Sequence, residues 1–111
     1  MIFIESRVFT ERLKDLAGET ERDVLEQIQS DLLKNPTRGA VVEGLGGIRK
    51  ARSANPSRGK GKRGGYRYLF LYLEHKQHIH LLLLFDKDDE ADLSKEERRL
   101  LRNLVHKIRN T

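Results

Sequence analysis

The stretch from Tyr66 to Phe85 reads YRYLFLYLEHKQHIHLLLLF, two apolar segments on either side of a short polar one. Residues 66–73 are rich in aromatic and branched side chains, a composition that favours a β-strand. Residues 79–85 are almost continuously apolar, which is typical of a strand inside a sheet that is covered on both faces. Because residues 74–78 are few and polar, they predict a hairpin connection between the two strands.

The chain before this hairpin predicts one short strand and two helices. Residues 2–5 are apolar and indicate the strand. The first helix ends near Gly18. Its apolar residues at helical spacing are Phe9, Leu13 and Leu16. The second helix is predicted from Thr20, its N-cap, to Asn35, because Pro36 disfavours helical geometry at the residue before it. Its apolar stripe consists of Val24, Leu25, Ile28, Leu32 and Leu33.

Between these helices and the hairpin, residues 40–42 could form a brief strand, and residues 48–54 alternate well enough for another. The two faces of this second strand would carry Ile48, Lys50 and Arg52, and Arg49, Ala51 and Ser53, respectively. Residues 55–65 are rich in glycine and basic side chains, and they predict a loop without regular structure.

The last element is a helix whose start is marked by Ser94 and Glu97, the two partners of a capping box. Its apolar stripe consists of Leu100, Leu101, Leu104, Val105 and Ile108. The predicted order is therefore β-α-α-β-β-β-α, an α+β fold in which helices flank a small, mostly antiparallel sheet. At 111 residues the chain is predicted to form one domain, residues 1–111.

Composition excludes several classes of site. The chain has no cysteine, so it has no disulfide, no thiolate zinc site and no cysteine nucleophile. His78 and His80 alternate onto one strand face, but no third ligand stands at a suitable spacing, so no metal and no cofactor are predicted. The N-terminus does not read as a signal peptide, and the longest apolar run is too short to span a bilayer. We expect a cytoplasmic protein without a membrane partner.

The charge of the chain is concentrated in one segment. There are 22 Lys and Arg residues against 17 Asp and Glu. Eight of the cations lie between residues 48 and 67 with no acidic residue among them: Arg49, Lys50, Arg52, Arg58, Lys60, Lys62, Arg63 and Arg67. Glycines are interleaved with these cations, which suits close approach to a phosphate backbone. The segment therefore predicts a nucleic-acid partner.

Three stretches stand in a characteristic order: residues 44–52, residues 59–67, and Phe85–Lys87 followed by residues 92–94. Together with the element order, they resemble the RelE superfamily of bacterial toxins, and in particular its HigB-like branch. The resemblance implies an endoribonuclease that cuts messenger RNA on the ribosome and so inhibits translation. It also implies a co-expressed antitoxin, a HigA-like protein with a helix-turn-helix domain in the HigB-like branch.

RNA cleavage by attack of the 2′-OH on the adjacent phosphorus needs a base, charge stabilisation and an acid for the leaving 5′-oxygen, and it needs no metal. By resemblance, Arg67 in the Gly-Gly-Tyr-Arg motif would contact the scissile phosphate. Lys60 and Lys62 would act as base or bind phosphate, and Lys87 would lie near the leaving group. One departure leaves the acid open, because Asp88 and Ser94 stand where RelE itself has an arginine and, roughly, a tyrosine.

Further RNA contacts are predicted at Arg49, Lys50, Arg52, Arg58 and Arg63, with Tyr66 or Tyr68 as a stacking ring. Arg49, Lys50 and Arg52 could equally form a charged strand surface, and Tyr66 could fill the core. Two other functions remain open for the segment 49–67: a non-catalytic RNA-binding module, and a basic face that receives an acidic protein partner.

Overall fold

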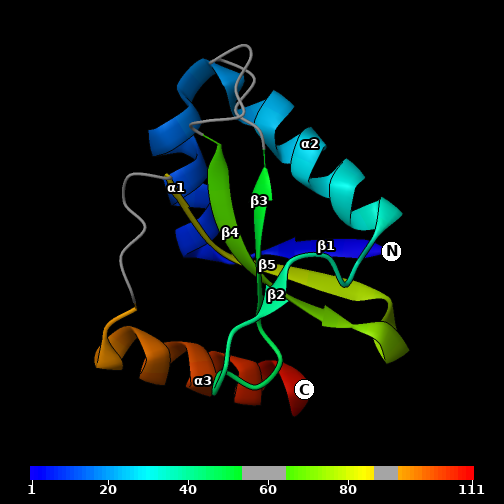
Figure 1. The fold of residues 1–111 in the computed structure, drawn as a ribbon, viewed down its shortest axis with the longest axis vertical. Coiled ribbons are helices and arrows are strands. Elements are labelled where there is room, and N and C mark those ends of the chain that lie inside the picture. The colour runs from blue at the N-terminus through cyan, green and yellow to red at the C-terminus, as the bar shows by residue number, and fades with distance from the viewer. Residues whose placement is uncertain (54–64, 87–92) are drawn as a thin grey trace.

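The computed structural model describes residues 1–53, 65–86 and 93–111. Figure 1 shows that these residues form a mixed sheet with helices around it. The elements are β1 (Ile2–Glu5), α1 (Arg7–Ala17), η1 (Gly18–Thr20), α2 (Glu21–Lys34), β2 (Ala40–Val41), β3 (Arg49–Ser53), β4 (Tyr66–Leu73), η3 (Glu74–Lys76), β5 (His78–Asp86) and α3 (Lys95–Arg109). The predicted α+β fold is confirmed.

The sheet has five strands in the order β1-β5-β4-β3-β2. β1 runs parallel to β5, and the other neighbours are antiparallel, so the sheet is mostly antiparallel as predicted. The hairpin of β4 and β5 is confirmed at the centre of the sheet. Residues 40 and 41 form the edge strand β2 by pairing with Lys50 and Arg49, so four strands follow the helices where the predicted order has three.

An irregularity divides the central hairpin. Leu69 pairs with Leu83 and Phe70 pairs with Leu81, so Leu82 is an extra residue on β5. A bulge of this kind bends a strand and increases its twist. The carbonyl of Leu82 accepts a hydrogen bond from the Ser6 hydroxyl at 2.8 Å, which ties the bulge to the start of α1.

The two faces of the sheet are covered by different helices. The core under α1 and α2 consists of Phe9, Leu13, Val24, Ile28, Leu32, Ala51, Tyr66, Tyr68, Phe70, Ile79, Leu81 and Leu84. The core under α3 consists of Leu45, Ile48, Leu69, Leu71, Leu73, Leu82, Phe85, Leu101 and Val105. β5 contributes to both cores, which confirms why residues 79–85 are apolar without alternation.

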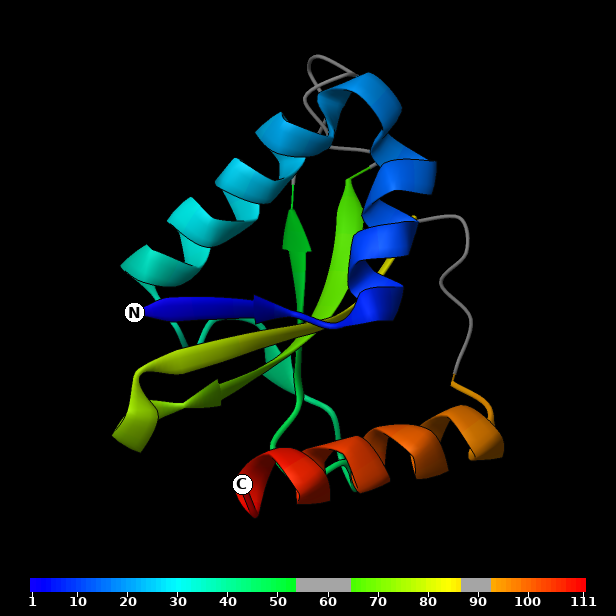
Figure 2. The same cartoon turned by 180° about the vertical axis from the view of Figure 1, so that it is seen from behind.

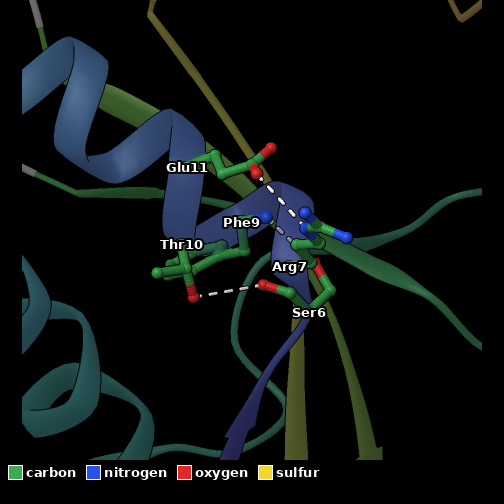
Figure 3. A network of polar contacts seen from close by, with 5 residues as sticks. All are labelled: Ser6, Arg7, Phe9, Thr10 and Glu11. Atoms are coloured by element: carbon green, nitrogen blue, oxygen red, sulfur yellow. Dashed lines mark hydrogen bonds and ion pairs between the residues drawn. The ribbon is translucent and has the colours of Figure 1, made fainter.

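Local signals place the helices. Ser6 caps α1, since its hydroxyl accepts a hydrogen bond from the Phe9 amide at 2.9 Å (Figure 3). In the same turn the Thr10 hydroxyl donates to the Ser6 carbonyl, and Nε of Arg7 lies 3.3 Å from Oε2 of Glu11. The predicted capping box of Ser94 and Glu97 is present at the start of α3. Thr20 precedes α2 as predicted, but its hydroxyl donates to the Ala17 carbonyl and makes no cap hydrogen bond.

Figure 2 shows α1 and α2 diverging from their shared turn on one side of the sheet. Two residues of the predicted apolar stripes are exposed: Leu33 is 58% exposed and Leu100 is 53% exposed, because each lies at the edge of its stripe. Among the described residues, no helix combines the length and apolar content that crossing a bilayer requires.

Candidate functional site

Strand pairing brings three cations of the basic segment onto one face of the sheet. Arg52 on β3 is directly opposite Arg67 on β4, and Lys50 is opposite Leu69. Because side chains alternate along a strand, all three belong to the same face as Ile48 and Leu69, the face that α3 covers further along. The tip of β3 and the start of β4 lie far from α3 (Figure 1), so α3 does not cover the cations there. The predicted division of β3 into two faces is confirmed.

The cations line a hollow of about 450 Å³ that is open to solvent. Its lining residues are Arg38, Gly39, Ala40, Lys50, Ala51, Arg52 and Arg67. Four of the seven are cationic and none is acidic, so the hollow favours an anion. The guanidinium forks of Arg52 and Arg67 suit the paired oxygens of a phosphate or carboxylate.

Lys50 lies over the aromatic ring of Phe85 on this face of the sheet. Its Nζ atom lies 5.7 Å from the centroid of Phe85, a distance suited to a cation–π contact. Phe85 also pairs with Arg67 in the β4–β5 register, so Lys50 and Arg67 both lie next to Phe85. Phe85 therefore supports the cationic face from the core below.

Arg38 is a cation of the hollow that the sequence analysis does not identify. It lies in the turn between α2 and β2, outside the segment 49–67, and no motif marks it. Its Nη1 atom lies 2.7 Å from the Asp31 carboxylate and donates to the Tyr68 hydroxyl at 3.4 Å. Burial raises the pKa of Tyr68 to about 12, which keeps the hydroxyl protonated and available as an acceptor for Arg38.

The structure separates two predicted RNA contacts from this site. The Tyr66 ring is 2% exposed in the core under α1 and α2, and its hydroxyl donates to the Leu16 carbonyl at 3.2 Å, so stacking on a base is excluded. Arg49 lies on the other face of β3, where its Nη1 atom donates to the Thr37 carbonyl at 2.7 Å. Arg49 therefore anchors the turn before β2.

The remaining predicted site residues, Arg58, Lys60, Lys62, Arg63 and Lys87, lie outside the described residues, as does Asp88. The described positions next to those segments meet at one place in the sheet. Ser53 pairs with Tyr66, and Tyr66 pairs with Asp86 on its other side. The chain thus leaves and re-enters the described structure beside Arg52 and Arg67.

The histidine pair lies elsewhere. The rings of His78 and His80 share one face of β5 with centroids 6.3 Å apart. Partial burial, with smaller contributions from His78 and Lys76, lowers the pKa of His80. Across residues 1–53, 65–86 and 93–111, no three His, Cys, Asp or Glu side chains are grouped as metal ligands.

Three solved structures with a similar fold contain the E. coli RelE toxin. The intact E. coli RelBE toxin–antitoxin complex matches at 15% identity, 83% of this chain, 98% of that chain and a TM-score of 0.57. The isolated E. coli RelE toxin matches at 15% identity and a TM-score of 0.54, and the match covers 93% of this chain and 97% of that chain. An E. coli RelE mutant in the free state, with two arginines changed to alanine, matches at 12% identity and a TM-score of 0.54. This match covers 75% of this chain and 79% of that chain.

At these identities the similarities show the fold alone. A family model described as the RelE toxin of the RelE/RelB toxin–antitoxin system matches residues 7–111. This match covers α1, α2, α3 and every strand of the sheet except β1. The chain therefore belongs to the RelE family, whose members are toxins of toxin–antitoxin systems.

Proposed function

We propose that this toxin is a ribosome-dependent endoribonuclease that cuts messenger RNA and thereby stops translation. The observation that carries the proposal is the hollow at the β3–β4 edge, lined by four cations and no acid. A phosphodiester backbone is the anion that such a surface fits, because its charges repeat along the strand. Family membership is consistent with this activity.

In the proposed reaction, the 2′-oxygen of one ribose attacks the adjacent phosphorus as a base removes its proton. The bond from phosphorus to the 5′-oxygen then breaks, and that oxygen takes a proton from a general acid or from water. The products are a 2′,3′-cyclic phosphate and a free 5′-hydroxyl, and no electron donor or metal takes part. Arg52 and Arg67, paired across β3 and β4, would stabilise the charge that develops on the phosphoryl oxygens.

Lysines that lie outside the described residues would assist the reaction at the attacking and the leaving oxygen. Lys60 or Lys62 would be the base, since neighbouring cations disfavour a charged ammonium and so lower a lysine pKa. Lys87, directly after β5, would stabilise the leaving 5′-oxygen. Arg58 and Arg63 would add charge for binding the strand, and so would Lys50 on the sheet face.

The ribosome would supply the alignment that the toxin lacks. No aromatic side chain is among the seven residues that line the hollow, and Tyr66 is buried. The described part of the site would therefore bind phosphates, and its lining offers no stacking platform for a base. A ribosome that already holds the messenger in a fixed conformation would position the attacking and leaving oxygens in line.

We also propose a cognate antitoxin as the regulating partner. The RelBE neighbour is a complex of a toxin with its antitoxin. The stretches 44–52 and 59–67 favour the HigB-like branch of the family, in which the partner is a HigA-like protein with a helix-turn-helix domain. The cationic hollow is one surface that such a partner would need to block or distort.

Mapping of transcript 5′ ends after induced expression tests the proposed function. We expect new 5′ ends within translated messengers, with free 5′-hydroxyls, that depend on ongoing translation. Growth arrest without new transcript ends would contradict the nuclease and would favour a protein that binds RNA without cutting it.

A further inference from the structure

We propose that Arg38 binds a second phosphate of the same RNA strand, next to the scissile one. The inference rests on the proposed function and extends it, because it adds a contact from the turn after α2 to the cations of β3 and β4. The messenger would then cross the edge of the sheet from Arg67 towards α2.

The position of Arg38 is fixed by its backbone. Gly39 follows it with φ +79°, and a Cβ atom at Gly39 would lie 2.1 Å from the Lys50 carbonyl oxygen. The turn is therefore packed directly against β3. Ala40 then pairs with Lys50 in the β2–β3 register, and Arg49 donates to the Thr37 carbonyl from below the turn. These contacts keep Arg38 at the wall of the hollow.

The side chain of Arg38 is held at one nitrogen only. Both of its contacts, to Asp31 and to Tyr68, use Nη1. In the described part of the chain, Nη2 and Nε donate to no protein acceptor, so one edge of the guanidinium fork is available for a ligand. The side chain is 30% exposed and lines the hollow.

Asp31 orients this arginine from outside the lining of the hollow. Its second oxygen accepts a hydrogen bond from Gln27 at 2.9 Å, so the carboxylate is held on α2 by two partners. Asp31 is not among the lining residues, whereas Arg38 is. An arginine whose rotamer is fixed before binding loses less entropy when it meets a phosphate.

A phosphate suits this position better than a nucleobase. The hollow offers no aromatic face for stacking and no carboxylate for reading a base, while the available edge of a guanidinium matches two phosphate oxygens. Two arginine positions on different elements, Arg38 and Arg67, would engage separate phosphates of one strand. Such contacts position an RNA strand without reading its sequence.

The test measures binding of a short single-stranded RNA, made uncleavable by 2′-deoxy substitution and labelled with a fluorophore, at several KCl concentrations. When a variant no longer binds one of the phosphates, the slope of log affinity against log salt becomes shallower by about 0.7 for single strands. We expect this reduction for Arg38→Gln, a slope close to wild type for Arg38→Lys, and no change for Arg102→Gln. Arg102 is an exposed cation on α3 and controls for net charge. Thermal unfolding of each variant reports its fold.

The outcomes separate this inference from the proposed function. If wild type binds the RNA and Arg38→Gln keeps the wild-type slope, the contact at Arg38 is disproved while RNA binding stands. If Arg38→Gln keeps that slope but weakens binding of an acidic antitoxin, the occupant is a protein carboxylate and the inference is equally wrong. If wild type binds no RNA and no transcript ends appear on expression, the proposed function itself fails.

Discussion

Single residues decide which cations can act together. Arg52 and Arg67 share the cationic face because the β3–β4 register sets them opposite each other, whereas Arg49, one residue from Lys50, points to the other face. Tyr66 precedes Arg67 and is buried for the same reason. Adjacent residues in a strand point to opposite faces of the sheet, so only one residue of each adjacent pair can reach the cationic face.

Replacing Arg67 with Ala should abolish toxicity and leave the fold intact. Removing one charge-stabilising donor lowers a cleavage rate by about 100- to 1,000-fold, because the developing negative charge is left without its partner. Cleavage of a messenger on purified ribosomes measures the effect, and Arg102→Ala, the same change on the far helix, should cut at the wild-type rate. An Arg67→Ala variant that still arrests growth like its parent would show that the active site lies elsewhere.

Tyr68 should make the protein sensitive to alkali. Its folded pKa of about 12 lies above the unfolded value of 10.0, so the folded state holds the proton more tightly. The stability that this provides is complete below pH 10 and is lost as pH rises from 10 towards 12. Urea unfolding at pH 9 to 11 should therefore show a steeper decline for wild type than for Tyr68→Phe. Equal declines in the two proteins would contradict the shift.

At the scale of elements, one short turn holds part of the site in place. β2 has only two residues, yet it fixes the turn that carries Arg38 against β3. The bulge at Leu82 bends β5, and the Ser6 hydroxyl ties it to α1. The long elements thus supply the core, and the turn before β2 brings Arg38 to the hollow.

Gly39→Ala should separate the β2 turn from β3. A methyl group at this position meets the Lys50 carbonyl at 2.1 Å, and the positive φ adds strain of about 1–2 kcal/mol for a residue with a Cβ. Gly18→Ala is the matched control, since Gly18 also has a positive φ but has open space around its Cβ position. Urea unfolding should show a larger decrease in stability for Gly39→Ala than for Gly18→Ala. Equal decreases would mean that the turn relaxes without cost.

At the scale of the whole molecule, charge and apolar surface are separated. The cationic hollow lies at the β3–β4 end of the sheet, and a largely apolar hollow of about 270 Å³ lies between the start of α1 and α3. Exposed Val8 and Leu100 are among the residues that line the second hollow. A regulating partner therefore has two chemically different surfaces available.

Association with the antitoxin should be steered by charge. The basic segment 49–67 attracts an acidic stretch at long range, so the association rate should fall steeply between low and high ionic strength. Stopped-flow mixing at several salt concentrations measures this rate, with Lys60→Ala and Lys62→Ala lowering it. A rate insensitive to salt, unchanged in these variants but reduced by Leu100→Ala, would indicate docking on the apolar hollow instead.

The sequence by itself determined most of the helices and strands, and which residues share each face of β3. The central hairpin, both N-terminal helices, the capping box of α3 and the two faces of β3 were all predicted, because each depends on neighbours within a few residues. The resemblance of residues 44–52 and 59–67 to the RelE superfamily also agrees with the family match. Hydrophobic periodicity and the order of motifs can be read from the sequence alone, because neither depends on contacts between distant residues.

Only the tertiary structure decided which residues share the hollow. Arg38 lies outside the basic segment and joins Lys50, Arg52 and Arg67 through the packing of its turn on β3. Tyr66 was removed from the site by burial under α1 and α2, which sequence alternation alone could not assign to a face. The physical reason is that register, bulges and helix docking depend on contacts between residues far apart in the chain, and these contacts select one arrangement from several that local patterns allow.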